Sequence, residues 1–330
     1  MRFSMTLVFS ILFLIVLVFY LNLDTRSPAL EQEPMMQKLM PLNIQDEITS
    51  LQIEKLKERE TITLARGEKG QWMIQHPITA TADPLFVQGL ISALRLSPQV
   101  RRLSPEQDWE AYGLKTPEIK IGVETKAGKM RRYLDLGNLN NSGEFIFARW
   151  EEEKDYFLLS TDIKSAFSQS VYSLRLKSIF QTPLKDISKI HFRIEREEYE
   201  LSQHQGRWFW MEPILLLGDA LDPTQAVKMT NKIQNLSVKE FFDGAQPGSQ
   251  ATGFTSMGNR IEITSVHSEK EVLDLGKEMT GKDSLYAKKP DSPNVFLVSK
   301  SNLAGFFKGM EVLTRELVEK ERQKSPAKAA

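Results

Sequence analysis

The stretches GQWMIQHP (residues 70–77) and GRWFWMEP (residues 206–213) decide how this chain is organised. In each stretch a Gly is followed by a Trp two places later and by a Pro five places after that Trp. Three further landmarks recur in the same order: YGL (112–114) with TGF (252–254), LDLG (134–137) with LDLG (273–276), and FARWEEEKDYFLLS (147–160) with YAKKPDSPNVFLVS (286–299). We interpret the chain as a tandem duplication with a period near 139 residues, which is too long for a solenoid repeat, so each copy is expected to be a domain of its own.

Each copy opens with a hairpin followed by a helix. In the first copy, ETITLAR and QWMIQ alternate apolar and polar residues around the turn GEKG, and the second copy has EYELSQ and RWFWM around HQG. A helix then begins at Asp83-Pro84, because Asp is a favourable N-cap and Pro is favourable at the first helical position, and Asp222-Pro223 repeats this signal. The residues expected to face the core from these two helices are Phe86, Leu90, Ala93 and Leu94, and then Met229, Ile233 and Leu236.

Strand-like runs and a second helix complete each copy. In the first copy the runs are EIKIGVET, RRYLDLG, EFIFARW and YFLLS. The closing helix is expected to bury Ile163, Ala166 and Phe167 in the first copy, and Leu303, Phe306, Phe307 and Met310 in the second. This order without regular βαβ alternation predicts an α+β fold, with two tandem copies of a mainly antiparallel sheet module that has two short helices each. We place the copies at residues 46–182 and 183–318, followed by a disordered tail at 319–330.

The amino terminus predicts a membrane anchor. Residues 3–23 carry no charge, and a helix of this length rises about 31 Å, enough to cross the hydrocarbon core of a bilayer. The run ends without the small residues of a signal-peptidase site, so residues 1–23 are predicted to be an uncleaved signal anchor. Residues 24–45 contain Pro28, Pro34 and Pro41 and are predicted to be a stalk. The short head before the span places the bulk of the chain outside the cytoplasm.

Composition excludes several classes of function. Lys and Arg together number 43, as do Asp and Glu, so the chain lacks the net positive charge that nucleic-acid binding normally needs. The chain has no cysteine, which excludes disulfides, thiolate metal sites, cysteine nucleophiles and lipid attachment through Cys.

One motif resembles a phosphate-binding loop. The segment GKEMTGKD fits G-x-x-x-x-G-K through Gly281 and Lys282. The next residue in such loops is a Ser or Thr that binds magnesium, whereas here it is Asp283, whose charge would repel phosphate. The following SLYAKK reads as a strand, not as a helix. We therefore predict a hairpin turn and no nucleotide cofactor.

Two other patterns have a structural and a functional interpretation. Trp208-Phe209-Trp210 would suit a sugar-stacking platform, but Trp210 corresponds to Ile74 in the first copy, which favours core packing for Trp208 and its counterpart Trp72. Asp135 and Asp274 of the two LDLG motifs precede a Gly that can adopt positive φ, so we predict a turn.

The histidines do not form a recognisable site. His76, His191, His204 and His267 lack zinc-ligand spacing, and none recurs in both copies. The chain has no G-x-S-x-G elbow, although a Ser-His-Asp hydrolase is recognised by geometry and stays an alternative. We assign no catalytic, cofactor-binding or metal-binding residue.

These landmarks resemble a bacterial extracytoplasmic domain family of unknown function, often duplicated behind one membrane anchor. Its pattern is carried here by residues 72–77, Asp83, residues 112–114, residues 134–137 and residues 147–149, while the second copy has Thr252 in place of the Tyr. Family members are similar to proteins encoded beside gliding-motility-type ABC exporter components, which implies an accessory role in the cell envelope. The resemblance implies no catalytic residues.

Three functions follow as hypotheses. The preferred one is a single-pass bacterial inner-membrane protein that holds two modules in the periplasm as a binding or scaffold element of an envelope complex, with an ABC permease as partner. The first alternative is a periplasmic glycan- or small-molecule-binding protein that uses a groove between the modules. The second alternative is a cryptic hydrolase.

Overall fold

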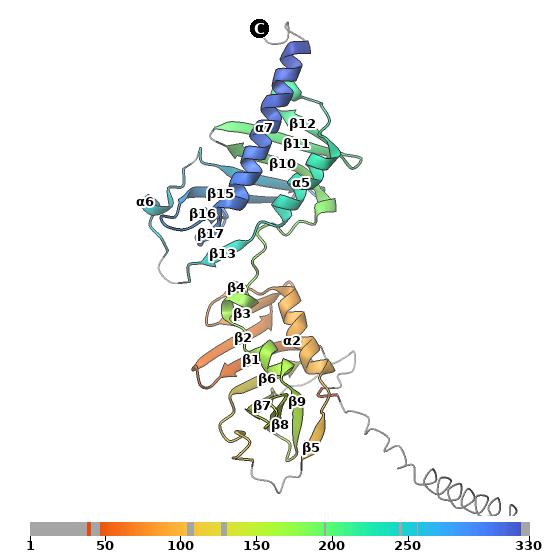
Figure 1. Ribbon diagram of the computed structural model, residues 1–330, viewed down its shortest axis with the longest axis vertical. Helices are drawn as coiled ribbons and strands as arrows, with labels where there is room; N and C mark the ends of the chain where they lie inside the picture. The colour runs from red at the N-terminus through yellow and green to blue at the C-terminus, as the bar shows by residue number, and fades with distance from the viewer. Residues whose placement is uncertain are drawn as a thin grey trace, which may run out of the picture. The chain divides into compact units, whose positions relative to one another are not determined.

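The chain divides into two compact units, Met1–Leu176 and Lys177–Ala330, which are described separately. Figure 1 shows the computed structural model, which describes residues 38–40, 47–103, 109–126, 131–194, 196–243, 246–255 and 257–324. The predicted boundary between residues 182 and 183 falls inside the second unit, because Ile179 and Phe180 are buried in the core of that unit. The predicted anchor lies outside the described residues. No described helix is long and apolar enough to cross a membrane.

The first unit is a nine-stranded antiparallel sheet with the order β4-β3-β2-β1-β6-β7-β8-β9-β5. Its strands are β1 (Ile48–Lys55), β2 (Glu60–Arg66), β3 (Trp72–His76), β4 (Ala80–Thr81), β5 (Arg101–Leu103), β6 (Ile119–Thr125), β7 (Arg132–Leu139), β8 (Phe145–Trp150) and β9 (Tyr156–Ser160). Its helices are α2 (Pro84–Leu96), α3 (Asp162–Phe167) and α4 (Val171–Leu174). The inward side chains of the strands and the buried faces of these helices form one core.

The second unit is an eight-stranded antiparallel sheet with the order β12-β11-β10-β14-β15-β16-β17-β13. Its strands are β10 (Ile187–Ile194), β11 (Glu197–His204), β12 (Arg207–Glu212), β13 (Val238–Phe241), β14 (Arg260–Ser265), β15 (Lys270–Glu278), β16 (Ser284–Lys288) and β17 (Val295–Ser299). Its helices are the 3-10 turns η1 (Leu184–Asp186) and η2 (Ile214–Leu216), and α5 (Pro223–Gln234), α6 (Ser249–Thr252) and α7 (Lys300–Lys324). Helices α5 and α7 pack on the same face of the sheet (Figure 1).

Both sheets have the same strand order once the short edge strand β4 is set aside, so that β3 corresponds to β12 and β5 to β13. The predicted α+β class with antiparallel sheets is confirmed. Two strands that the sequence pattern did not predict, β1 and β10, lie inside these sheets and join the opening hairpin to the later strands.

The predicted helix starts are confirmed in both units. The side chain of Asp83 accepts hydrogen bonds from the backbone N–H groups of Leu85 and Phe86, at 2.9 and 3.3 Å. Asp222 does the same for Thr224 and Gln225, at 2.9 and 3.1 Å. These caps satisfy N–H groups that have no partner within the helix.

Three expectations about the helices and the stalk need correction. Phe86 is 41% exposed, because the core-facing residues of α2 are Val87, Leu90, Ile91 and Leu94. Helix α7 is 25 residues long and ends at Lys324, so it is not short and it runs into the predicted tail. Leu39 and Met40, assigned to the stalk, are buried in the first core. The side chain of Phe306 is not among those described.

Candidate functional site

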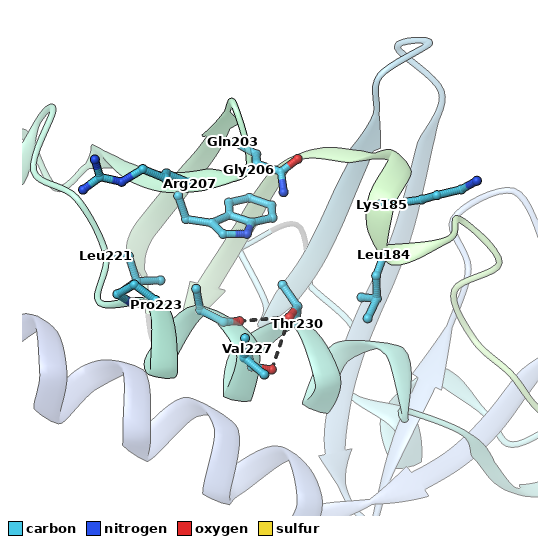
Figure 2. Close-up of a pocket in the computed structure, with 11 residues that line it drawn as sticks. Leu184, Lys185, Gln203, Gly206, Arg207, Leu221, Pro223, Val227 and Thr230 are labelled. Carbon is cyan, nitrogen blue, oxygen red and sulfur yellow. Dashed lines mark hydrogen bonds between the residues drawn. The ribbon is translucent and has the colours of Figure 1, made fainter.

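A pocket of about 330 Å³ lies in the second unit, between the β11–β12 hairpin and α5 (Figure 2). We call it the Trp208 pocket. Its lining residues are Leu184 and Lys185 from η1, Gln203, Gly206, Arg207 and Trp208 from the hairpin, and Leu221, Pro223, Ala226, Val227 and Thr230 from α5 and the segment before it. Most of this surface is apolar or aromatic, as in sites that bind small molecules or side chains.

Local backbone interactions hold these walls in place. Gln205 and Gly206 adopt positive φ at the hairpin turn, which brings Gln203 opposite Trp208 in the strand register. The backbone N–H of Leu221 donates to the carbonyl oxygen of Trp208 at 2.8 Å, so the segment before α5 is fixed against β12. The N-cap at Asp222 then directs α5 across the mouth of the pocket. The pocket is thus a product of the hairpin and the helix that the sequence predicted.

The polar side-chain groups of the lining residues are two cations, one amide, one hydroxyl and the indole N–H of Trp208. Lys185 and Arg207 lie on opposite sides, and their side chains point away from one another (Figure 2). Neither cation forms an ion pair with a described residue, but the guanidinium of Arg207 lies 5.8 Å from the centre of the Phe209 ring. The amide of Gln203 makes no hydrogen bond to a described residue. The hydroxyl of Thr230 donates to the carbonyl oxygens of Ala226 and Val227, at 2.9 and 3.2 Å, so its lone pairs are left to accept.

In the first unit, the region that corresponds to the Trp208 pocket is filled by side chains of that unit. Arg66 stands opposite Trp72 in the β2–β3 register, as Gln203 stands opposite Trp208. The guanidinium of Arg66 lies 4.8 Å from the centre of the Trp72 ring, and it also pairs with Glu47 at 3.2 Å.

Helices α2 and α5 also differ, because the side chains that face this region are larger in α2 than in α5. Counted from the N-caps, Val87 and Ile91 of α2 occupy the positions that Ala226 and Thr230 occupy in α5. The smaller side chains of α5, and the absence of an arginine opposite Trp208, leave space in the second unit where the first unit is filled.

The lining residues limit the chemistry that the pocket can support. Its lining residues include no His, Asp, Glu, Ser or Cys, and the two that could act as a base or a nucleophile, Lys185 and Thr230, are not hydrogen-bonded to a described side chain that would activate them. What it offers is an apolar floor, an amide that can donate and accept, and positive charge on two sides.

The structure places the tryptophans in the cores, as predicted. Trp72 belongs to the first core, and Trp208 and Trp210 belong to the second. Trp208 is only 5% exposed, yet its ring also lines the pocket. The core interpretation of Trp208 is therefore confirmed, and the sequence pattern did not predict that its ring would also line a pocket.

The segment that resembles a phosphate-binding loop is a hairpin, as predicted. It joins β15 to β16, with Gly281 at positive φ and no helix after it. The Lys282 ammonium pairs with Glu240 at 2.6 Å, and Asp283 accepts hydrogen bonds from the backbone and hydroxyl of Ser301.

The prediction that Asp135 and Asp274 lie at turns is wrong. Both lie within strands, β7 and β15, and the following Gly137 and Gly276 are not among the glycines with positive φ. These glycines are needed for close approach: a Cβ at Gly137 would lie 2.2 Å from the carbonyl oxygen of Tyr112, and one at Gly276 equally close to that of Thr252. The two landmarks YGL and LDLG are therefore packed against each other.

Asp135 is the centre of a buried charge cluster on the first sheet. It is 1% exposed and lies 3.3 Å from Arg149 Nε and 3.7 Å from Lys120 Nζ, while Arg149 also stacks on Trp109. Burial raises the pKa of Asp135, and the charges of Lys120 and Arg149, which act in the opposite direction, do not offset it. In the second unit Arg260 donates to Asp274 at 2.6 Å.

The raised pKa of Asp135 predicts how the stability of the first unit depends on pH. The carboxyl of Asp135 binds its proton more tightly in the folded protein than in the unfolded chain, so it stabilises the fold at low pH. This stabilisation is lost as the pH rises from 3.8, the ordinary pKa of the carboxyl, through its raised pKa in the folded protein. Urea unfolding of the native protein and Asp135→Asn, from about pH 3.5 to about pH 6, should show the native protein losing stability relative to the variant. If the native protein instead gains stability relative to the variant as the pH rises, the charges of Lys120 and Arg149 outweigh the effect of burial on the pKa of Asp135.

The four histidines have no shared site in the structure. His191 Nε2 lies 2.7 Å from Glu198, His204 lies 3.4 Å from the hydroxyl of Ser202, and His76 is exposed at the end of β3. The backbone N–H of His267 donates to the hydroxyl of Ser265. Among the described residues, no group of three or more His, Cys, Asp or Glu side chains is arranged to hold a metal ion.

The chain is thus a two-unit α+β protein whose second unit contains the Trp208 pocket. The chain belongs to the family described as a domain of unknown function (DUF4340), whose model matches residues 72–256, more than half of the chain. This match supports the resemblance seen in the sequence at the level of a family of unknown function. No curated protein and no solved structure matches the chain.

Proposed function

We propose that this protein is a membrane-anchored extracytoplasmic binding protein, an accessory subunit of a bacterial envelope complex without catalytic activity. Its proposed partner is an integral membrane protein of the ABC transporter class, as the similarity to proteins encoded beside such exporters implies. The observation that carries the proposal is the Trp208 pocket, because its groups suit non-covalent recognition and include no acid–base pair.

The proposed anchor is the apolar run at residues 3–23. It is followed by a short segment that reaches the first core at Leu39 and Met40. A binding protein held in this way meets its partner at a high effective concentration, which favours contacts that would be weak in solution.

We further infer that the two units are copies of one module. The recurring landmarks, the matching strand orders and the identical Asp-Pro helix starts support this. Duplication gives a reason for the difference at the pocket, since one copy can keep a filled core position while the other acquires a binding site.

The location is tested by topology. A reporter that is active only in the periplasm, fused after Ala330, should be active, because the proposed anchor at residues 3–23 would direct the residues after it outward. Activity from a cytoplasm-specific reporter at the same position would refute the proposed location.

The proposed partner is tested by co-purification with the native protein and with a variant whose pocket is blocked. Full-length protein extracted in mild detergent should retain an ABC permease. Val227→Trp should reduce that recovery about tenfold. Val227 is 59% exposed at the pocket mouth, so a larger side chain there blocks the pocket without entering the core. Gln88→Trp is the matched control, because Gln88 has the same position in α2. Native protein that purifies without any membrane partner would overturn the proposal.

A second candidate function is the binding of a glycan or another small molecule. It is favoured by the volume of the pocket, about 330 Å³, and by its aromatic wall, since ligand sites begin near this size. This site lies within the second unit. A ligand that raises the melting temperature of the native protein but not of Val227→Trp would support it.

A further inference from the structure

We infer that the Trp208 pocket receives one large apolar side chain carried by an acidic polypeptide segment. The inference rests on the proposed function and names the chemistry of the partner at the same site. It follows from three features of the pocket: its apolar floor, its charge and the placement of its polar groups.

The floor of the pocket calls for an apolar group. Trp208, Leu221, Ala226 and Val227 surround a space of about 330 Å³, which corresponds to roughly ten water molecules at about 30 Å³ each. Leu221, Ala226 and Val227 offer water no side-chain hydrogen-bonding partner. An aromatic or long aliphatic side chain that displaces this water gains the hydrophobic contribution of the surface that it buries.

The charge around the pocket calls for an acidic ligand. Lys185 and Arg207 flank it, no lining residue is acidic, and neither cation is paired with a described carboxylate. The first unit shows the opposite arrangement, in which Arg66 covers the tryptophan and Glu47 balances its charge. A basic ligand at Trp208 would meet two positive charges without that balance.

The placement of the polar groups favours an extended polypeptide as the ligand. Lys185 and Arg207 point in opposite directions, so a small anion cannot reach both while its apolar part fills the floor (Figure 2). A polypeptide advances about 3.3 Å per residue and can carry an acidic residue on each side of an apolar one. The free amide of Gln203 and the turn at Gly206, which has no side chain, leave room for hydrogen bonds to its backbone.

The test uses three blocked synthetic peptides and full-length protein in detergent micelles. Their sequences are Glu-Glu-Phe-Glu-Glu, Glu-Glu-Ala-Glu-Glu and Lys-Lys-Phe-Lys-Lys, and binding is measured by titration calorimetry at low and high salt. The acidic phenylalanine peptide should bind, should bind about tenfold more tightly than either of the others, and should weaken as salt rises.

Variants assign this binding to the pocket. Lys185→Glu with Arg207→Glu should weaken the acidic phenylalanine peptide about tenfold, and Val227→Trp should abolish its binding. Lys228→Glu with Lys277→Glu is the control, because it changes the net charge equally at exposed residues of the same unit that do not line the pocket. Gln88→Trp should leave the affinity unchanged.

Several outcomes would overturn the inference. These are preference for the basic peptide, equal affinity for the alanine peptide, no binding by any peptide, and equal weakening by the two charge-reversal pairs. The proposed function fails separately. A permease whose co-purification depends on Val227 but not on Lys185 and Arg207 leaves the function standing and refutes the acidic segment. If the acidic phenylalanine peptide binds but no membrane partner co-purifies, the proposed function is refuted and the inference about the acidic segment stands.

Discussion

Replacing Trp210 by Ala should remove most of the stability of the second unit and leave the first unit unchanged. Trp210 is fully buried in the second core, and truncation of a buried Trp to Ala costs about 3–5 kcal/mol. A domain has only about 5–15 kcal/mol in total, so the variant should lose most of its cooperative unfolding transition. The first unit should keep its own transition, because its core contains no residue of the second.

Two matched variants separate cavity formation from other effects. Phe209→Ala changes the neighbouring residue on the other face of β12, which is half-buried, and should cost much less. Trp210→Phe should also cost little, since the indole N–H of Trp210 has no hydrogen-bond partner among the described residues and its removal relieves a buried unpaired donor. The measurement is denaturant unfolding followed by circular dichroism. An unchanged second transition in Trp210→Ala would mean that the indole does not support the core.

The second large effect is expected at the two LDLG glycines. Gly137→Ala and Gly276→Ala each place a Cβ 2.2 Å from a carbonyl oxygen of the opposing loop, far inside the contact distance of about 3.3 Å. The clash is with backbone, so a side-chain rotation cannot relieve it. Each variant should destabilise its own unit by about 3 kcal/mol or more.

The control for these variants is Gly89→Ala. Gly89 lies on the exposed face of α2, and a Cβ there would meet nothing within 4 Å. This substitution should therefore stabilise the first unit by about 1 kcal/mol, because Ala is the better helix former. Thermal unfolding of all three variants gives the comparison. Equal effects at Gly89 and Gly137 would show that the loop and strand are not in contact.

Local signals were sufficient to predict most of the elements. Helix starts at Asp83 and Asp222 follow from side-chain capping, and the hairpins at Gly70 and Gly206 follow from turn chemistry, both of which act within a few residues. The recurrence of these signals also predicted two similar modules. The fold class could therefore be predicted from the sequence alone.

What could not be predicted depends on contacts between distant segments. The sequence pattern indicated a turn at Gly137. The actual reason for a glycine there could not be predicted, because the carbonyl oxygen that excludes a side chain belongs to Tyr112, in another part of the chain. The Trp208 pocket was missed for the same reason. It results from the combination of Gln203, Ala226 and Thr230, three unremarkable residues whose effect is visible only against Arg66, Val87 and Ile91 of the first unit.

The attachment of Leu39 and Met40 to the first core limits how far the first unit can lie from the proposed anchor. The backbone N–H of Leu39 donates to the carbonyl oxygen of Ser97 at 2.8 Å, so the chain is fixed to the end of α2 at this residue. With the proposed anchor ending at Leu23, only residues 24–37 are left as a tether, and even fully extended they span at most about 50 Å. The first unit is then confined to a layer next to the bilayer.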